Sequence, residues 1–156
     1  MKIGVILPSV AVQSAQNLDL ATAARHAEEI GLDSVWHGDH LAVGMPTLDA
    51  PIALCVAAGA TQHRRPVPVV AVGAAGALGT GAGVPTREEI ASGIGRAYGK
   101  PLEQAVPIPV TGHPAEAAER LAAYRDAGAG HLVMGISGGD WRGQCDLLAE
   151  ARALLA

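Results

Sequence analysis

Three side chains that could do chemistry follow a short apolar run. His37, Asp39 and His40 stand in the stretch "DSVWHGDHL" (33–41). Imidazole and carboxylate groups at this spacing could ligate a metal ion, or could move a proton beside a bound cofactor. A structural interpretation is also open, in which Asp39 caps the following segment and the histidines hydrogen-bond locally. To choose among these hypotheses we need the predicted secondary structure and the motifs around the stretch.

The metal hypothesis rests on similarity to the H-x-H-x-D-H motif of metallo-β-lactamase-like hydrolases. His37, Asp39 and His40 match its last three ligands, but Val35 stands where the first histidine would be. Such a site depends on several ligands in a fixed geometry, so the loss of one counts against it. The remaining histidines show no second paired spacing; they are His26, His63, His113 and His131. A metallohydrolase using His37, Asp39 and His40 is therefore the third of our functional hypotheses.

Composition limits the class of protein. The chain has 156 residues, which predicts a single domain over 1–156. Hydrophobic residues make up 49%, but aromatic residues only 3%, and Phe is absent. The core must therefore be built from Val, Ile, Leu and Ala, with close approach of helices to strands. The net charge of −4 and the lack of a basic run argue against a nucleic-acid partner.

Cysteine usage and hydropathy predict a cytoplasmic protein without a membrane partner. Cys55 and Cys145 are far apart and form no C-x-x-C motif, which fits a reducing compartment. The apolar run before Pro8 is too short for a signal peptide. Residues 66–86 carry no charge, but they contain three prolines and five glycines. We interpret them as a buried strand followed by a glycine-rich loop.

Strand and helix signals alternate along the chain. Short buried strands are predicted at 2–7, 34–38, 67–73 and 131–136, with a weaker one at 105–110 because Pro107 and Pro109 cannot donate to a ladder. Helices are predicted over 19–30, from 49 toward 61, from the capping box at 86–89, from Pro114 to Gly128, and over 144–156.

This alternation predicts an α/β fold with parallel strands and flanking helices. A truncated (β/α) TIM-type barrel of about five parallel strands is the first choice, and an open flavodoxin-like sheet is the alternative. A closed barrel of eight units needs about 250 residues, more than this chain supplies. In both arrangements ligands bind at the carboxyl ends of the strands, where His37, Asp39 and His40 are expected.

A second candidate site follows the last predicted strand. Gly135, Ser137, Gly138 and Gly139 form a loop of small residues before a helix, and Arg142 stands just beyond. Such a loop can expose backbone N–H groups to an anion, although a simple turn would have the same composition. The stretch "GTGAGVP" (79–85) does not have the G-x-G-x-x-G spacing of a dinucleotide site, because its sixth position is Val84.

Two blocks of the sequence resemble the luciferase-like flavin and deazaflavin oxidoreductases. The block "LATAARHAEEIGLDSVWHGDHLAV" (20–43), preceded by "MKIGVILPS" (1–9), is similar to the first units of that barrel. The block "PVTGHPAEAAERLAAYRDAGAGHLVMGI" (109–136) is similar to its penultimate unit and last strand. Residues 1–62 thus resemble N-terminal barrel units and residues 105–156 resemble C-terminal ones.

The resemblance implies an oxidoreductase or monooxygenase that uses reduced FMN or a deazaflavin coenzyme on a small organic substrate. It implies that His40 is a general acid or base and that Asp39 orients it or binds the cofactor. Trp36 would wall the pocket, although a packed core Trp is an equal alternative. The cofactor's anionic part would lie at Gly135, Ser137, Gly138, Gly139 and Arg142.

Members of that family are about twice as long, so the middle of the barrel is missing here. An unclosed sheet exposes two edges and an apolar inner face. We therefore expect a homodimer or higher homo-oligomer, or pairing with a second barrel-type subunit. Because the family's middle strands supply much of the cofactor contact, a non-catalytic flavin-binding or accessory subunit is the alternative function.

Overall fold

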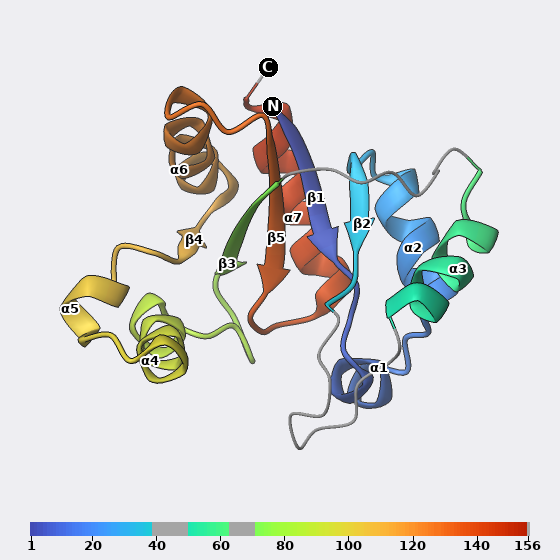
Figure 1. The fold of residues 1–156 in the computed structure, drawn as a ribbon, viewed down its shortest axis with the longest axis horizontal. Coiled ribbons are helices and arrows are strands. Elements are labelled where there is room, and N and C mark those ends of the chain that lie inside the picture. The colour runs from blue at the N-terminus through green and yellow to red at the C-terminus, as the bar shows by residue number, and fades with distance from the viewer. Residues whose placement is uncertain (39–49, 63–70, 156) are drawn as a thin grey trace.

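The computed structural model describes residues 1–38, 50–62 and 71–155. Five parallel strands form one sheet in the order β2-β1-β5-β3-β4, as Figure 1 shows. The strands are β1 (Lys2–Ile6), β2 (Ser34–Trp36), β3 (Val72–Leu78), β4 (Val110–Gly112) and β5 (His131–Ile136). The helices are α1 (Val10–Gln16), α2 (Leu20–Glu29), α3 (Ala50–Ala60), α4 (Arg87–Tyr98), α5 (Leu102–Ala105), α6 (Pro114–Asp126) and α7 (Trp141–Ala153). The predicted α/β class with a parallel sheet and flanking helices is confirmed.

The strand order places the two ends of the chain side by side. β1 lies between β2 and the last strand, β5. β3 lies between β5 and β4. A flavodoxin-like sheet has the order 2-1-3-4-5, with the third strand beside the first, so the sheet differs from that alternative. Within the described residues, β2 and β4 are the two edges of the sheet.

Two predicted strands are displaced from their observed positions. The third strand is Val72–Leu78 rather than 67–73, and residues 63–70 lie outside the described residues. Its Ala and Gly residues have low strand propensity, which hid it from the pattern. They are nevertheless required there, since a Cβ on Gly76 would lie 1.8 Å from the carbonyl oxygen of Val110. The fourth strand is Val110–Gly112 rather than 105–110, because the prolines at 107 and 109 lack the N–H of a ladder.

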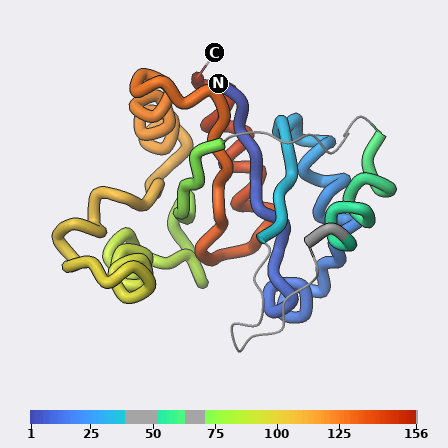
Figure 2. The backbone as a smooth tube through the Cα atoms, viewed as in Figure 1, coloured from blue at the N-terminus to red at the C-terminus, as the bar shows by residue number. Residues whose placement is uncertain are grey.

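One face of the sheet holds the hydrophobic core. Helices α2, α6 and α7 pack there, and Figures 1 and 2 show α7 behind β1 and β5. Buried side chains of this core include Ile3, Val5, Leu132 and Met134 from the sheet, Ala24 and Ala27 from α2, Leu121 from α6, and Cys145 and Leu148 from α7. The alanines let the helices approach the sheet closely, as the composition predicts.

The alternate residues of the strands form what we name the second face. Register places Gly4 beside Ser34 and Val133, and Ile6 beside Trp36. The second face includes Gly4, Ile6, Ser34, Trp36, Gly73, Ala75, His131, Val133 and Gly135. In Figure 1 no described helix lies in front of β1 and β5 on this side. Parallel sheets are normally covered on both faces, so this face is the unusual feature of the fold.

Local signals place the helix ends. Thr86 and Glu89 form the predicted capping box at the start of α4, and Asp19 caps α2 by accepting from Thr22 N–H. Gly31 follows α2 with a φ of 78°, a conformation that favours glycine. The helices α1 and α5 were not predicted from the sequence.

Both cysteines are free thiols. Cys55 is exposed, whereas Cys145 is buried, and burial raises the pKa of its thiol above the ordinary value. None of the helices in the described ranges combines the length and the apolar character needed to cross a membrane.

Candidate functional site

Asp39 and His40, the predicted catalytic pair, lie outside the described residues. Of the three candidate side chains in the opening stretch, the structure describes His37, which is half-buried. Its Nδ1–H donates a 2.9 Å hydrogen bond to the carbonyl of Gly38. His37 therefore follows the end of β2, at the carboxyl edge of the sheet, where a ligand site was expected.

No set of three metal-ligating side chains comes together within the described residues. Of the three ligands of the metallohydrolase hypothesis, the structure describes His37, whose imidazole is hydrogen-bonded to the carbonyl of Gly38. This geometry adds no support to the third functional hypothesis.

Trp36 belongs to the second face rather than to the core. Its indole Nε1–H donates a 2.7 Å hydrogen bond to Ser34 Oγ, two residues earlier on β2. The same oxygen lies 2.8 Å from His131 Nε2, and the rings of Trp36 and His131 meet edge to face with centroids 5.6 Å apart. Gly4 lies beneath this contact, and a Cβ there would stand 2.1 Å from Ser34 Oγ. A glycine on β1 thus permits the two neighbouring strands to join their side chains.

An indole N–H can only donate, so Ser34 Oγ accepts from Trp36 Nε1–H. The hydroxyl keeps its own proton and a second lone pair, so toward His131 Nε2 it can either donate or accept, according to the tautomer of the imidazole. Desolvation by burial lowers the pKa of His131, with a further lowering from Lys2, and the opposing effect of Asp33 is smaller than that of burial. Burial thus favours the neutral form of the His131 imidazole.

In the predicted anion loop after β5, several backbone N–H groups already donate hydrogen bonds to other groups of the protein. Ser137 N–H donates to Gly76, and Gly139 N–H donates to Gly83 at 2.7 Å. At the start of α7, Trp141 N–H donates to Gln16 Oε1 and Gly143 N–H to the Asp140 carboxylate. These four donors are therefore not available to a phosphate, and the Asp140 carboxylate already occupies the positive end of the helix.

The glycine loops after β3 and β5 pack against each other. Gly138 is in contact with Pro85, where a Cβ would lie 2.6 Å from the proline Cδ. Gly139 and Gly83 both have positive φ, at 80° and 75°. These glycines thus serve close backbone packing at the carboxyl ends of β3 and β5. Ser137 and Arg142 are exposed beside them.

The predicted cofactor residues therefore fall into two groups. Trp36 and Gly135 share the second face, with Ile6 between them, since a Cβ on Gly135 would lie 3.5 Å from Ile6 Cδ1. Ser137, Gly138, Gly139 and Arg142 lie beyond the strand end, in the loop and first turn of α7.

Sequence reasoning missed Gly4, Ser34 and His131 as members of a site. The alternation of Ser34 and Trp36 on one strand shows that they share a face, but the approach of His131 depends on the register of β5 against β1. The capping residue of α6 is His113, whose N–H donates to Glu116 Oε2 at 2.8 Å.

A comparison with protein-family models, curated proteins and solved structures finds no match in any of the three.

Proposed function

We propose that this chain is a luciferase-like oxidoreductase that binds the ring system of reduced FMN or of a deazaflavin coenzyme on the second face of the sheet. The supporting observation is the order of the strands. The two blocks that resemble the family are far apart in sequence, yet their strands β2, β1 and β5 are neighbours. First and last strands pair in this way in a closed barrel, so the order supports a truncated (β/α) barrel.

The second face fits a flat ring. Gly73 and Gly135 place no side chain on it, and a Cβ added to Gly73 would meet no atom within 4 Å. Ile6, which is 38% exposed, and half-buried Trp36 stand beside this flat area. Apolar side chains around a flat surface are the usual lining of a site for an aromatic cofactor.

The phosphate of such a cofactor fits less well. The amides of Ser137, Gly139 and Trp141 are bound within the protein, and Asp140 puts a carboxylate at the helix start. Arg142 is exposed and could contribute a charge. We therefore propose that affinity comes mainly from the ring, and that riboflavin binds about as tightly as FMN.

The bound cofactor would supply hydride transfer or oxygen activation. The chain's own contribution in the proposal is position and a proton path. Trp36 walls the ring, and Ile6 and Val133 exclude water from it. His40 is the general acid or base on the reacting substrate, with its protonation governed by Asp39.

The proposal also includes self-association, because an oligomer would cover the second face. A parallel sheet face that carries apolar side chains and that none of the described helices covers favours a homodimer, a higher homo-oligomer or pairing with a second barrel-type subunit. The accessory-subunit alternative differs in one respect, since it binds a flavin or partner without turnover.

The test is a titration of the purified protein with FMN and with the deazaflavin coenzyme, each oxidised and reduced, followed by absorbance and fluorescence. Saturable binding in the micromolar range, worth about 8 kcal/mol, is the expected result. No binding up to about millimolar would contradict the proposal. The variant His40→Ala then distinguishes an enzyme from an accessory subunit. An enzyme should lose turnover in this variant while its affinity for the flavin stays unchanged, whereas an accessory subunit has no turnover to lose.

A further inference from the structure

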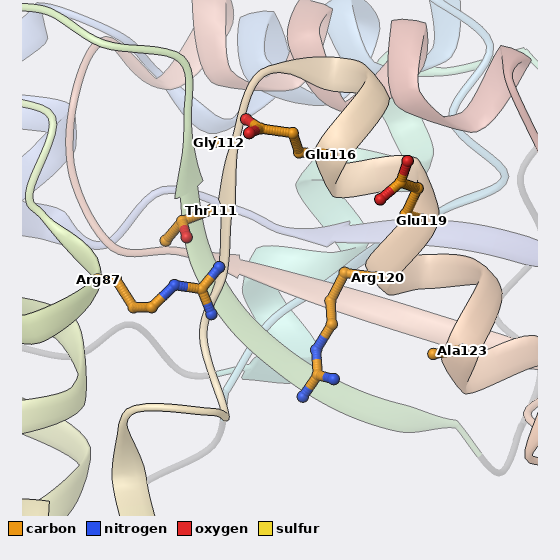
Figure 3. A pocket seen from close by; sticks show the side chains of 7 residues that line it. All are labelled: Arg87, Thr111, Gly112, Glu116, Glu119, Arg120 and Ala123. Carbon is orange, nitrogen blue, oxygen red and sulfur yellow. The ribbon is translucent and has the colours of Figure 1, made fainter. Parts of the chain in front are cut away.

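A groove separate from the proposed flavin site runs beside the edge strand β4. It has a volume of about 610 Å³, within the range of small-molecule sites, and lies between β4, the first turn of α4 and one side of α6 (Figure 3). Its lining residues are Arg87, Thr111, Gly112, Glu116, Glu119, Arg120 and Ala123. Four of these seven are charged, which is a high proportion for a surface that serves packing alone.

The two arginines are held in place by backbone carbonyls. Arg87 Nη1–H donates to Pro109 at 3.1 Å, and Arg120 Nη2–H donates to Pro107. Each of these bonds uses one of the five N–H donors of a guanidinium, and Arg120 Nε is buried without a hydrogen-bond partner. Both side chains are half-buried. Anchored guanidinium groups with unused donors are suited to a carboxylate.

The edge of β4 adds a backbone donor. The carbonyl of Gly112 points toward β3, where it accepts from Gly79 N–H at 2.8 Å. In a strand the N–H and C=O of one residue point to the same edge and those of the next residue to the opposite edge, so the N–H of Thr111 points away from β3, toward the groove. Pro107 and Pro109 have no N–H on that edge. Thr111 thus offers its amide, and its hydroxyl lines the same groove.

The other end of the groove is acidic. Glu116 folds over Gly112 and accepts from His113 N–H, and Glu119 is exposed one turn of α6 further on. Figure 3 shows the two carboxylates at one end and the two guanidinium groups at the other. A phosphate dianion would be repelled by Glu116 and Glu119, whereas a molecule with one negative and one positive group would match both ends.

We propose that this groove binds a small zwitterion of the α-amino acid class. Its carboxylate lies on Arg87, Arg120 and the N–H of Thr111, and its ammonium group lies toward Glu119. The site is independent of the flavin proposal, because the groove is at the far edge strand from Trp36 and contains none of the residues proposed to contact the flavin.

The experiment is a titration of the ¹⁵N-labelled protein with each of the twenty common amino acids, followed by amide chemical shifts. Acetate, methylammonium and inorganic phosphate are the comparison ligands. We expect saturable shifts of the Thr111 and Gly112 amides with at least one amino acid, at an affinity about tenfold above that for acetate. Failure of all twenty to shift these amides up to about 20 mM, or tighter binding of phosphate, would overturn the proposal.

Substitutions test the basic end and the acidic end of the groove independently. Arg87→Lys and Arg120→Lys keep the charge but lose the planar fork, and should weaken amino-acid binding about tenfold. Glu119→Gln should weaken the amino acid but leave acetate unchanged. Arg96→Ala is the matched control, because Arg96 also lies on α4 but donates to Ser92 outside the groove. An equal loss in Arg96→Ala would contradict the assignment, and the amide spectrum of each variant reports whether it is folded.

Discussion

Ser34 Oγ and His131 Nε2 lie 2.8 Å apart across β1, although 97 positions separate them in the sequence. The strand between them contributes Gly4 at the crossing point. The contact thus ties together β2, β1 and β5, the three strands in which the two ends of the chain meet.

Gly4→Ala should break this contact. The new Cβ would lie 2.1 Å from Ser34 Oγ and 3.0 Å from Trp36 Nε1, so both side chains would have to move. We expect a loss of about 1–3 kcal/mol in the free energy of unfolding, measured by urea denaturation. Gly73→Ala on the same face is the control, since its Cβ would meet no atom within 4 Å. Equal losses in the two variants would contradict this explanation.

Stability should depend on the protonation of His131. Burial lowers the pKa of His131 in the folded protein below its ordinary value of 6.5, so between these two pKa values the unfolded chain binds more protons than the folded one. The free energy of unfolding therefore rises with pH across this window. The contribution is complete above about pH 6.5 and is lost as the pH falls through the folded pKa.

The measurement is urea denaturation at several values between about pH 5 and pH 8, for the native chain and for His131→Gln. Gln can still form a hydrogen bond with Ser34, as donor or acceptor, but does not titrate in this range. The free energy of unfolding of the native chain, minus that of His131→Gln, should decrease as the pH is lowered. Parallel profiles would show that His131 does not contribute to the pH dependence.

Gln144→Leu should destabilise the end of β3. The buried Gln144 amide pairs with both peptide groups of Leu78, accepting from its N–H at 2.6 Å and donating to its carbonyl at 2.7 Å. Leucine would leave both groups buried and unpaired, at a cost of about 2–4 kcal/mol. Faster hydrogen exchange at the Leu78 amide locates the effect. Gln104→Leu, at an exposed position, is the control and should change little.

Local signals in the sequence predicted the parts of the fold that depend on neighbouring residues. Thr86 with Glu89, and Pro114 at the first turn of α6, fix helix starts through contacts within four residues. Strand β5 was predicted with its observed ends because His131–Ile136 is an unbroken apolar run after a polar start. These signals need no knowledge of the tertiary structure.

The parts that were missed depend on distant residues. Strand β3 is rich in Gly and Ala, and the close approach of β4 that requires Gly76 is visible only in the assembled sheet. The pairing of Gln144 with Leu78 joins positions 66 residues apart. The groove likewise depends on α4 and α6 meeting at β4, which brings Arg87 and Arg120 to one surface.

The most direct test of the proposed function uses Gly73, where a side chain can be added without a clash. We compare FMN and riboflavin binding to the native chain, to Gly73→Leu, and to the control Gly93→Leu on α4, where an added Cβ also meets no atom within 4 Å. We predict that the native chain and Gly93→Leu bind both flavins with similar affinity, and that Gly73→Leu loses at least about tenfold. Unchanged flavin binding by Gly73→Leu would contradict a ring site on the second face.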